Sequence, residues 1–368
     1  MAHIEPALLE YWLRDYYFNA TYDLSSSGVQ DFSVKDLKEL IGLDLRQFDD
    51  MYFHDSPALG SDELREALAQ QYGQTANSVM VGNGSSEVIF LLMQALIEPG
   101  DDVIVVSPCY PALRQVAASI GCTIRDWELS PDDDFKPDLN TLASLITDKT
   151  KAVVINFPHN PTGASLTHSQ QRELVNLLQG KGIYLIWDAV FADMQYGTPL
   201  LDFHKLYDKT ISLGTLSKAY GLPGMRVGWA FAPEDVLEKC VHWRDYTTIC
   251  LSPLIEGIAT HVLQNANTLI DMRCEQAQKN IAIVESWASA HIDDIHWVPP
   301  KGGVSTFPRF TRVEDVTSFC RELINEQGVL LAPGSCFGYP SHVRLGLGGS
   351  SDKLQTGLGL ISDKLDNS

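Results

Sequence analysis

Short hydrophobic runs alternate with helix-like segments through the middle of the chain, and this alternation limits the possible folds most. The β-rich apolar runs are Val103–Val106, Ala152–Ile155, Ile183–Trp187 and Thr210–Leu213. The helix-like segments are Asp62–Tyr72, Ser86–Ile97, Tyr110–Ile120, Leu139–Ile146 and Ser169–Leu178. Strands that alternate with helices predict an α/β fold with a mainly parallel sheet between helices, whose binding residues gather at the carboxyl ends of the strands.

The last part of the chain has a different pattern, which predicts a second and smaller domain. A helix-like segment at Val313–Glu326 is followed by short strand-like segments at Val329–Leu331 and Val343–Leu345, a pattern typical of a small α+β domain. The predicted division is residues 1–45 as an N-terminal arm and part of the small domain, 46–289 as the large domain, and 290–368 as the rest of the small domain.

Charge and composition exclude several classes of function. The 368 residues include 47 acidic and 27 basic ones, a net charge of −20, so nucleic acid and anionic membrane surfaces are not expected partners. The N-terminus lacks a basic region before an apolar stretch, and the longest apolar run, Val88–Ile97, is too short to span a bilayer. The seven cysteines contain no C-x-x-C pair, which predicts reduced thiols, no metal site and a cytoplasmic protein.

Residues 82–87, Gly-Asn-Gly-Ser-Ser-Glu, come directly before a strongly apolar helix. Free backbone N–H groups, the positive end of that helix and the hydroxyls of Ser85 and Ser86 would converge there, which favours anion binding. The same residues could also form an ordinary capping turn. This segment alone leaves both interpretations open.

Three further polar residues follow predicted strands. Lys218 lies among small hydroxyl residues, with Arg226 eight positions later, and a lysine held among neutral groups can lose its proton and form a Schiff base. A surface lysine is the alternative, but it would not need the glycine- and proline-rich run beside it. Asn160 lies in a turn that can aim its amide at a ligand. Asp188 closes an apolar strand, where only a partner makes burial of a carboxylate tolerable.

In this order and spacing, the segments 82–87, 156–163, 187–188 and 215–228 resemble the motifs of class I/II aminotransferases, which are pyridoxal-phosphate enzymes of fold type I. The resemblance covers nearly the whole chain and implies pyridoxal 5'-phosphate as the cofactor. It implies that Lys218 forms the Schiff base and that Asp188 keeps the ring nitrogen protonated. The other implied roles are Asn160 at the phenolic oxygen, Tyr110 on the ring face, Ser85, Ser86, Thr215 and Arg226 at the phosphate, and Arg344 with the backbone near Gly28 at the substrate α-carboxylate.

Two positions depart from the family pattern. The family has a tyrosine three residues after the aspartate, whereas this chain has Phe191, so one donor to the phenolic oxygen is missing. A second family tyrosine, which reaches the phosphate of the neighbouring subunit in a homodimer, is replaced by Asp55. A carboxylate near a phosphate is unfavourable unless a cation lies beside it. Either Asp55 turns to solvent, or the substrate supplies the cation.

These departures, with segments 12–14, 23–29, 156–161 and 244–246, resemble a divergent branch, the capreomycidine synthases, which cyclise a hydroxylated arginine. The resemblance implies a hydroxy-L-arginine substrate that loses water and closes a ring. A hydroxyl on C3 would give a six-membered ring and one on C4 a five-membered ring, and both remain open. A true aminotransferase is the first alternative. A non-catalytic binding module is the second, although the presence of Lys218 and Asp188 argues against it.

The guanidinium of such a substrate needs acidic groups to orient it. Asp55 and Glu5 are the candidate acids, and Ser25 and His54 are weaker candidates. Glu5 has an equally good interpretation as a solvated residue near the N-terminus.

Overall fold

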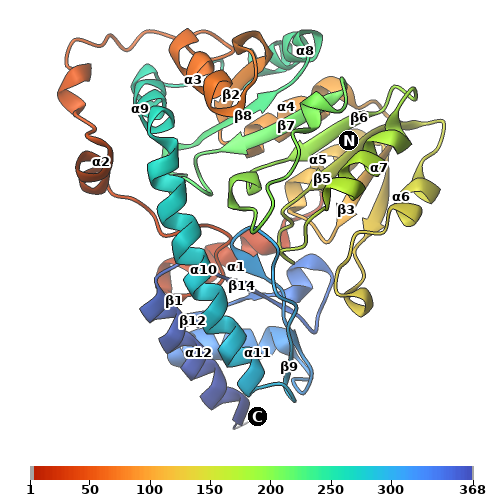
Figure 1. Cartoon of the computed structure of the whole chain (residues 1–368), viewed down its shortest axis with the longest axis vertical. Coiled ribbons are helices and arrows are strands. Elements are labelled where there is room, and N and C mark those ends of the chain that lie inside the picture. The colour runs from red at the N-terminus through yellow and green to blue at the C-terminus, as the bar shows by residue number, and fades with distance from the viewer. Residues whose placement is uncertain (1–3, 367–368) are drawn as a thin grey trace.

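The computed structural model describes residues 4–366 and contains two lobes (Figure 1). The larger lobe is built on a seven-stranded sheet with the order β2-β8-β7-β6-β5-β3-β4. Its strands are β2 (Val79–Asn83), β3 (Asp102–Ser107), β4 (Thr123–Glu128), β5 (Thr150–Asn156), β6 (Tyr184–Asp188), β7 (Thr210–Thr215) and β8 (Val227–Phe231). Only β8 runs against its neighbours, so the predicted mainly parallel sheet is confirmed.

Helices cover both faces of this sheet. They are α3 (Asp62–Tyr72), α4 (Ser85–Leu96), α5 (Pro111–Ile120), α6 (Leu139–Leu145), α7 (His168–Leu178), α8 (Glu234–Arg244) and α9 (Pro253–Gln264). Successive residues of a strand point to opposite faces, and in β3 Val103 and Val105 join the core under α4 and α5, while Ile104 and Val106 join the core under α6 and α7. Burial on both faces explains why these strands are continuous hydrophobic runs.

The smaller lobe combines both ends of the chain. It contains α1 (Leu8–Tyr16), β1 (Tyr22–Asp23), β9 (Ile295–His296), β10 (Ser305–Thr306), β11 (Arg309–Phe310), α11 (Val316–Gln327), β12 (Val329–Leu330), β13 (Ala332–Pro333), β14 (Val343–Gly346) and α12 (Ser351–Asp366). Tyr22 in β1 lies opposite Val329 in β12, in a parallel pair. The N-terminal segment therefore forms part of the small lobe.

Two helices do not follow the predicted domain boundaries. Helix α2 (Val34–Ile41) falls within the predicted arm, but Leu37 and Ile41 pack in the core of the large lobe, together with Leu64 of α3. Helix α10 (Ala266–Ala290) runs through both lobes (Figure 1), with Leu269 in the core of the large lobe and Val284 in that of the small lobe. The lobes therefore meet within α10 and not at residue 290.

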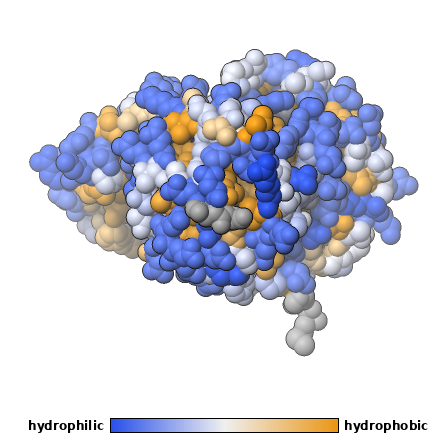
Figure 2. All heavy atoms as spheres, turned by 90° about the horizontal axis from the view of Figure 1, so that it is seen from below, coloured by the Kyte–Doolittle hydropathy of each residue, from blue (hydrophilic) through white to orange (hydrophobic). Residues whose placement is uncertain are grey.

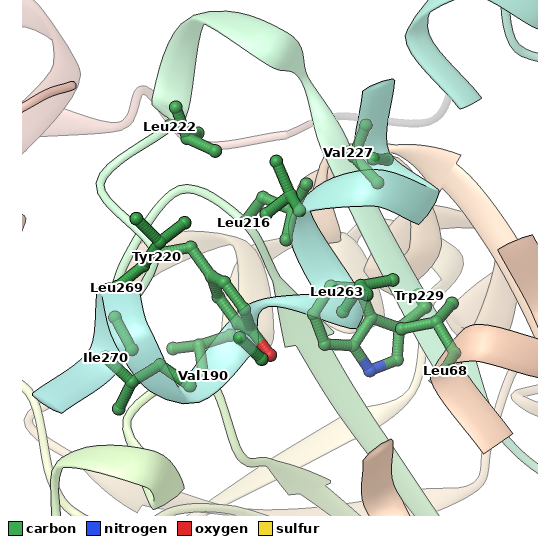
Figure 3. Close-up of a cluster of buried hydrophobic side chains, with 14 of the residues drawn as sticks. Leu68, Val190, Leu216, Tyr220, Leu222, Val227, Trp229, Leu263, Leu269 and Ile270 are labelled. Atoms are coloured by element: carbon green, nitrogen blue, oxygen red, sulfur yellow. The ribbon is translucent and has the colours of Figure 1, made fainter. Parts of the chain in front are cut away.

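The loop after β7, which carries Lys218, is held by a hydrophobic cluster. Leu216 and Tyr220 of this loop pack with Leu269 of α10 and with Trp229 of β8 (Figure 3). Gly214 permits this packing, because a Cβ at that position would lie 2.2 Å from the Trp229 ring. The backbone on either side of Lys218 is thus fixed in place.

The surface, the helix lengths and the cysteines can be compared with what the composition predicts. The face shown in Figure 2 is mostly hydrophilic, with hydrophobic residues in small separate areas. Within residues 4–366, no helix is long and apolar enough to cross a membrane. All seven cysteines are free thiols.

Candidate active site

A pocket of about 620 Å³ lies between the two lobes. It gathers the carboxyl ends of β5, β6 and β7, the first turn of α4, and residues 23–31 of the N-terminal segment. The sequence-predicted residues that line it are Ser25, Gly28, Ser85, Ser86, Tyr110, Asn160, Asp188, Thr215, Lys218, Arg226 and Arg344. Glu5, His54 and Asp55 do not line it, and all three are exposed.

The Lys218 amine lies in this pocket and donates a hydrogen bond to Ser27 Oγ at 3.0 Å. Burial, helped by the positive charge of Arg344, lowers the pKa of Lys218 to about 8, although the charge of Asp188 opposes this shift. A fraction of the amine is therefore uncharged near neutral pH, which suits a nucleophile or a base.

Asp188 ends strand β6 and is only 5% exposed. The backbone N–H of Val190 donates to its Oδ1 at 3.4 Å, and Asn156 Nδ2 donates to its backbone carbonyl at 3.0 Å. Burial raises the pKa of Asp188 to about 7. Among the described residues no cation lies within ion-pair distance of this carboxylate, so the site suits a cationic ligand group.

The start of α4 forms a concave cradle together with Arg226. Gly84 precedes the helix with a φ of +81° and supplies no side-chain cap. A Cβ at Gly84 would lie 2.3 Å from Arg226 Nη2, and a Cβ at Gly228 would lie 2.2 Å from the backbone nitrogen of Ser85. Because glycine stands at both positions, the guanidinium and the helix N-terminus face one space. This arrangement suits a phosphate group, and it favours the anion-binding interpretation of residues 82–87.

Hydroxyl groups extend the cradle. Ser86 Oγ lies 3.3 Å from the hydroxyl of Tyr110. Thr215 Oγ1 donates to the carbonyl of Val227 at 2.8 Å and accepts from the backbone N–H of Ser217. Ser217 also lines the pocket, although the sequence analysis did not select it.

Arg344 in β14 is 2% exposed and faces the pocket. Its Nε donates to the carbonyl of Ser25 at 2.9 Å, and its Nη1 donates to Asn160 Oδ1 at 3.4 Å. Burial lowers the pKa of Arg344 to about 10, while the charge of Asp23 raises it. No carboxylate in residues 4–366 forms an ion pair with this guanidinium, so it suits a carboxylate ligand.

The family model for aminotransferase class I and II matches residues 36–361. The chain belongs to this family. It is 41% identical over 366 residues to the capreomycidine synthase of Streptomyces vinaceus, a match that covers 98% of this chain and 94% of that one.

Solved structures agree with the family assignment. A PLP-dependent aminotransferase from Streptococcus suis has a TM-score of 0.94 and 28% identity, covering 99% of this chain and 98% of that one. The PLP-dependent cyclase OrfR has a TM-score of 0.93 and 36% identity, with the same coverage. The chain is therefore a pyridoxal-phosphate enzyme of fold type I, and its matches place it with the PLP-dependent cyclases of the family.

The pocket fits the cofactor of the aminotransferase family. Pyridoxal phosphate carries an aldehyde, a basic ring nitrogen and a phosphate. The amine of Lys218 suits the aldehyde, the unpaired buried carboxylate of Asp188 suits the protonated nitrogen, and the cradle at Gly84 suits the phosphate.

The positions that depart from the aminotransferase pattern can now be located. Phe191 is buried, and Lys218 Nζ lies 5.7 Å from the centre of its ring, so an aromatic face stands where a hydroxyl donor would be. Asp55 is exposed, and Cys250 Sγ lies 3.9 Å from its Oδ1. Asp55 and His54 do not contact the pocket of their own chain.

Sequence reasoning missed several acids of the pocket. Glu10, Asp23 and Asp31 line it, whereas the predicted acid Glu5 does not. A signal was present in α1, because residues spaced i, i+3 and i+7 share one helix face. Glu10 and Leu13 of α1, and Tyr17 in the turn directly after it, follow this spacing and all line the pocket.

Proposed function

We propose that this enzyme converts a hydroxy-L-arginine into a cyclic guanidine amino acid by loss of water and ring closure. The preferred substrate is 4-hydroxy-L-arginine and the product L-enduracididine, by overall likeness to the cyclase of guanitoxin biosynthesis. The observation that carries the proposal is that Glu10, Asp23 and Asp31 line the same pocket as Lys218 and Arg344. Three carboxylates would attract a guanidinium and repel the second carboxylate of an acidic substrate.

The residues of the pocket have separate roles in this proposal. When bound, pyridoxal phosphate supplies an electron sink for the pair left when the Cα proton is removed. The Lys218 amine takes that proton and later returns it. Asp188 holds a proton on the ring nitrogen. The remaining roles are Arg344 and the backbone near Gly28 at the α-carboxylate, Ser85, Ser86, Thr215 and Arg226 at the phosphate, and Asn160 and Tyr110 at the ring.

The reaction balances without a second substrate. A C3 proton is removed, and the C4 hydroxyl then leaves with one proton as water. A guanidine nitrogen bonds to C4 and loses one N–H proton, and protons return to C3 and Cα. The five-membered ring then contains C4, C5 and the three guanidine atoms that join them. The net change is loss of one water, with no oxidation and no keto-acid partner. A C3 hydroxyl would give the six-membered ring of the alternative.

The proposed reaction predicts a product that is one water lighter than its substrate, formed without any α-keto acid. We would incubate purified enzyme separately with 3-hydroxy- and 4-hydroxy-L-arginine and determine product mass and ring size by NMR. Conversion of only the 3-hydroxy compound would replace the preferred substrate by the alternative. A strict requirement for an α-keto acid would identify an aminotransferase.

We also propose that the enzyme is a homodimer with shared active sites. Tyr52 and Phe53 are 80% and 78% exposed on one loop, and Tyr246 is 90% exposed on another. The contact between Cys250 and Asp55 joins the two loops. Clustered exposed hydrophobic groups mark association surfaces, and isologous pairing is the commonest oligomer symmetry. In this arrangement Asp55 would reach the site of the partner subunit.

The dimer proposal predicts separate effects for two neighbouring substitutions. Phe53→Asp should yield monomers in sedimentation, because it places a charge in the contact. Asp55→Asn should leave the dimer and the cofactor in place but weaken the substrate interaction by about 1.5–3 kcal/mol, since it removes a charge-assisted bond. An active monomer of the wild type would contradict the shared site, and unchanged turnover in Asp55→Asn would exclude its guanidine role.

A further inference from the structure

Helix α1 is fixed at the boundary of the two lobes. Leu9 packs in a core cluster of the large lobe, and Trp12 packs in that of the small lobe, where its Nε1 donates to the carbonyl of Leu331 at 2.8 Å. Leu9 and Trp12 are both buried. These contacts turn the face with Glu10 and Leu13 toward the pocket. Glu10 is therefore part of the pocket wall.

The acids Glu10, Asp23 and Asp31 differ in the interactions that their carboxylates already make. Asp23 Oδ1 accepts from the backbone N–H and the hydroxyl of Ser25, at 2.8 and 2.7 Å, so it shapes the turn whose carbonyl receives Arg344. Burial raises the pKa of Asp31, and the charge of Arg273 partly offsets that effect. The carboxylate of Glu10 has no hydrogen-bond or ion-pair partner in residues 4–366. Of the three, Glu10 has all its acceptor capacity available.

Glu10 also lies close to the proposed sites for the amine and carboxylate of the substrate. Burial sets the low pKa values of Lys218 and Arg344, and the negative charge of Glu10 raises both. Ring closure requires the guanidine to fold back toward C3 or C4, near the α-carbon. An acid that lines the same pocket as Lys218 and Arg344 can hold that folded geometry, whereas an acid at the far end of an extended side chain cannot.

We propose that Glu10 binds the guanidinium of the substrate through a charge-assisted pair and holds it over the carbon that it attacks. Glu10 thereby selects substrates with a cationic side chain. The identity of the reaction rests on the proposed function, but selection for a cation does not.

The test compares two ligands of nearly equal shape, L-arginine with a charged guanidinium and L-citrulline with a neutral urea. Their affinities for the holoenzyme are measured from the change in cofactor absorbance. Glu10→Gln should weaken arginine binding by roughly 10- to 150-fold and leave citrulline binding nearly unchanged. Glu10→Asp should keep part of the preference for arginine. Asp15→Asn is the matched control, because it removes an exposed acid of the same helix that does not line the pocket.

Equal losses for both ligands in Glu10→Gln, or an unchanged affinity for arginine, would overturn the inference. The two proposals fail separately. Wild-type enzyme that prefers arginine through Glu10 but does not cyclise hydroxyarginine would refute the proposed reaction and retain the role of Glu10. Cyclisation of hydroxyarginine by an enzyme that shows no preference for arginine would refute the role of Glu10 and retain the proposed reaction.

Discussion

Lys218→Ala is expected to lower turnover by roughly 10²–10⁴-fold or more, because it removes the group that takes and returns the Cα proton. Borohydride treatment should fix the cofactor to wild-type protein at Lys218 and leave it removable from the variant. The pKa of about 8 adds a pH signature: cofactor uptake by the apoprotein should accelerate with rising pH and level off above about 8, as the amine loses its proton.

Lys353 provides the matched control for this experiment, because it is a second lysine that lines the pocket. Lys353→Ala should still be fixed to the cofactor by borohydride, with the attachment mapped to Lys218 by peptide mass spectrometry. A Lys218→Ala protein with wild-type turnover would refute the assignment.

Asp188→Asn is expected to lower kcat by about 10²–10³-fold, the usual effect of removing one preorganised electrostatic partner. The amide cannot keep the ring nitrogen protonated, so removal of the Cα proton becomes slow. Steady-state kinetics with saturating cofactor would measure the loss. Asp193→Asn is the control, because Asp193 also has a raised pKa from burial but bonds to Tyr72 and does not line the pocket.

Asp188→Asn lowers activity, but it should raise the stability of the apoprotein. The pKa of Asp188 rises from 3.8 to about 7 on burial, so the stability that its protonated form contributes is full below 3.8 and is lost as the pH rises through 7. Asp188→Asn has no such loss. Its apoprotein should melt above wild-type apoprotein at pH 8, by a margin that shrinks toward pH 4, and equal melting at both pH values would contradict this.

Four strands of the large sheet, β3, β5, β6 and β7, were predicted from the sequence, whereas β2, β4 and β8 were missed. Strand β4 lies at the sheet edge and carries the partly exposed Arg125 and the exposed Glu128, so it has no apolar run. Strand β8 begins within the segment interpreted only as a lysine motif. Edge exposure and motif overlap therefore hide strands that pairing in the sheet makes evident.

The cofactor-facing side of the pocket was predictable because parallel strands bring their polar ends together. The opposite side was not, since it depends on contacts between distant parts of the chain. Trp12 and Leu331 meet across 319 positions, and this contact, with the burial of Leu9 in a second core cluster, places α1 over the pocket and turns Glu10 inward. Periodicity identifies the inner face of such a helix but not which site the helix covers.

The pocket described above takes its walls from three parts of the chain: the N-terminal segment, the large lobe and the C-terminal part that contains Arg344. The residues that fit the cofactor come from the large lobe, at the start of α4, at the end of β6 and in the segments that follow β5 and β7, whereas Glu10, Asp23 and Asp31 all come from residues 10–31. Sequence changes in the short N-terminal stretch can therefore alter substrate choice without disturbing the residues that hold the cofactor. An ancestral scaffold of this family could diverge in specificity through a few early residues, and grafting this stretch between relatives is a natural route to redesign.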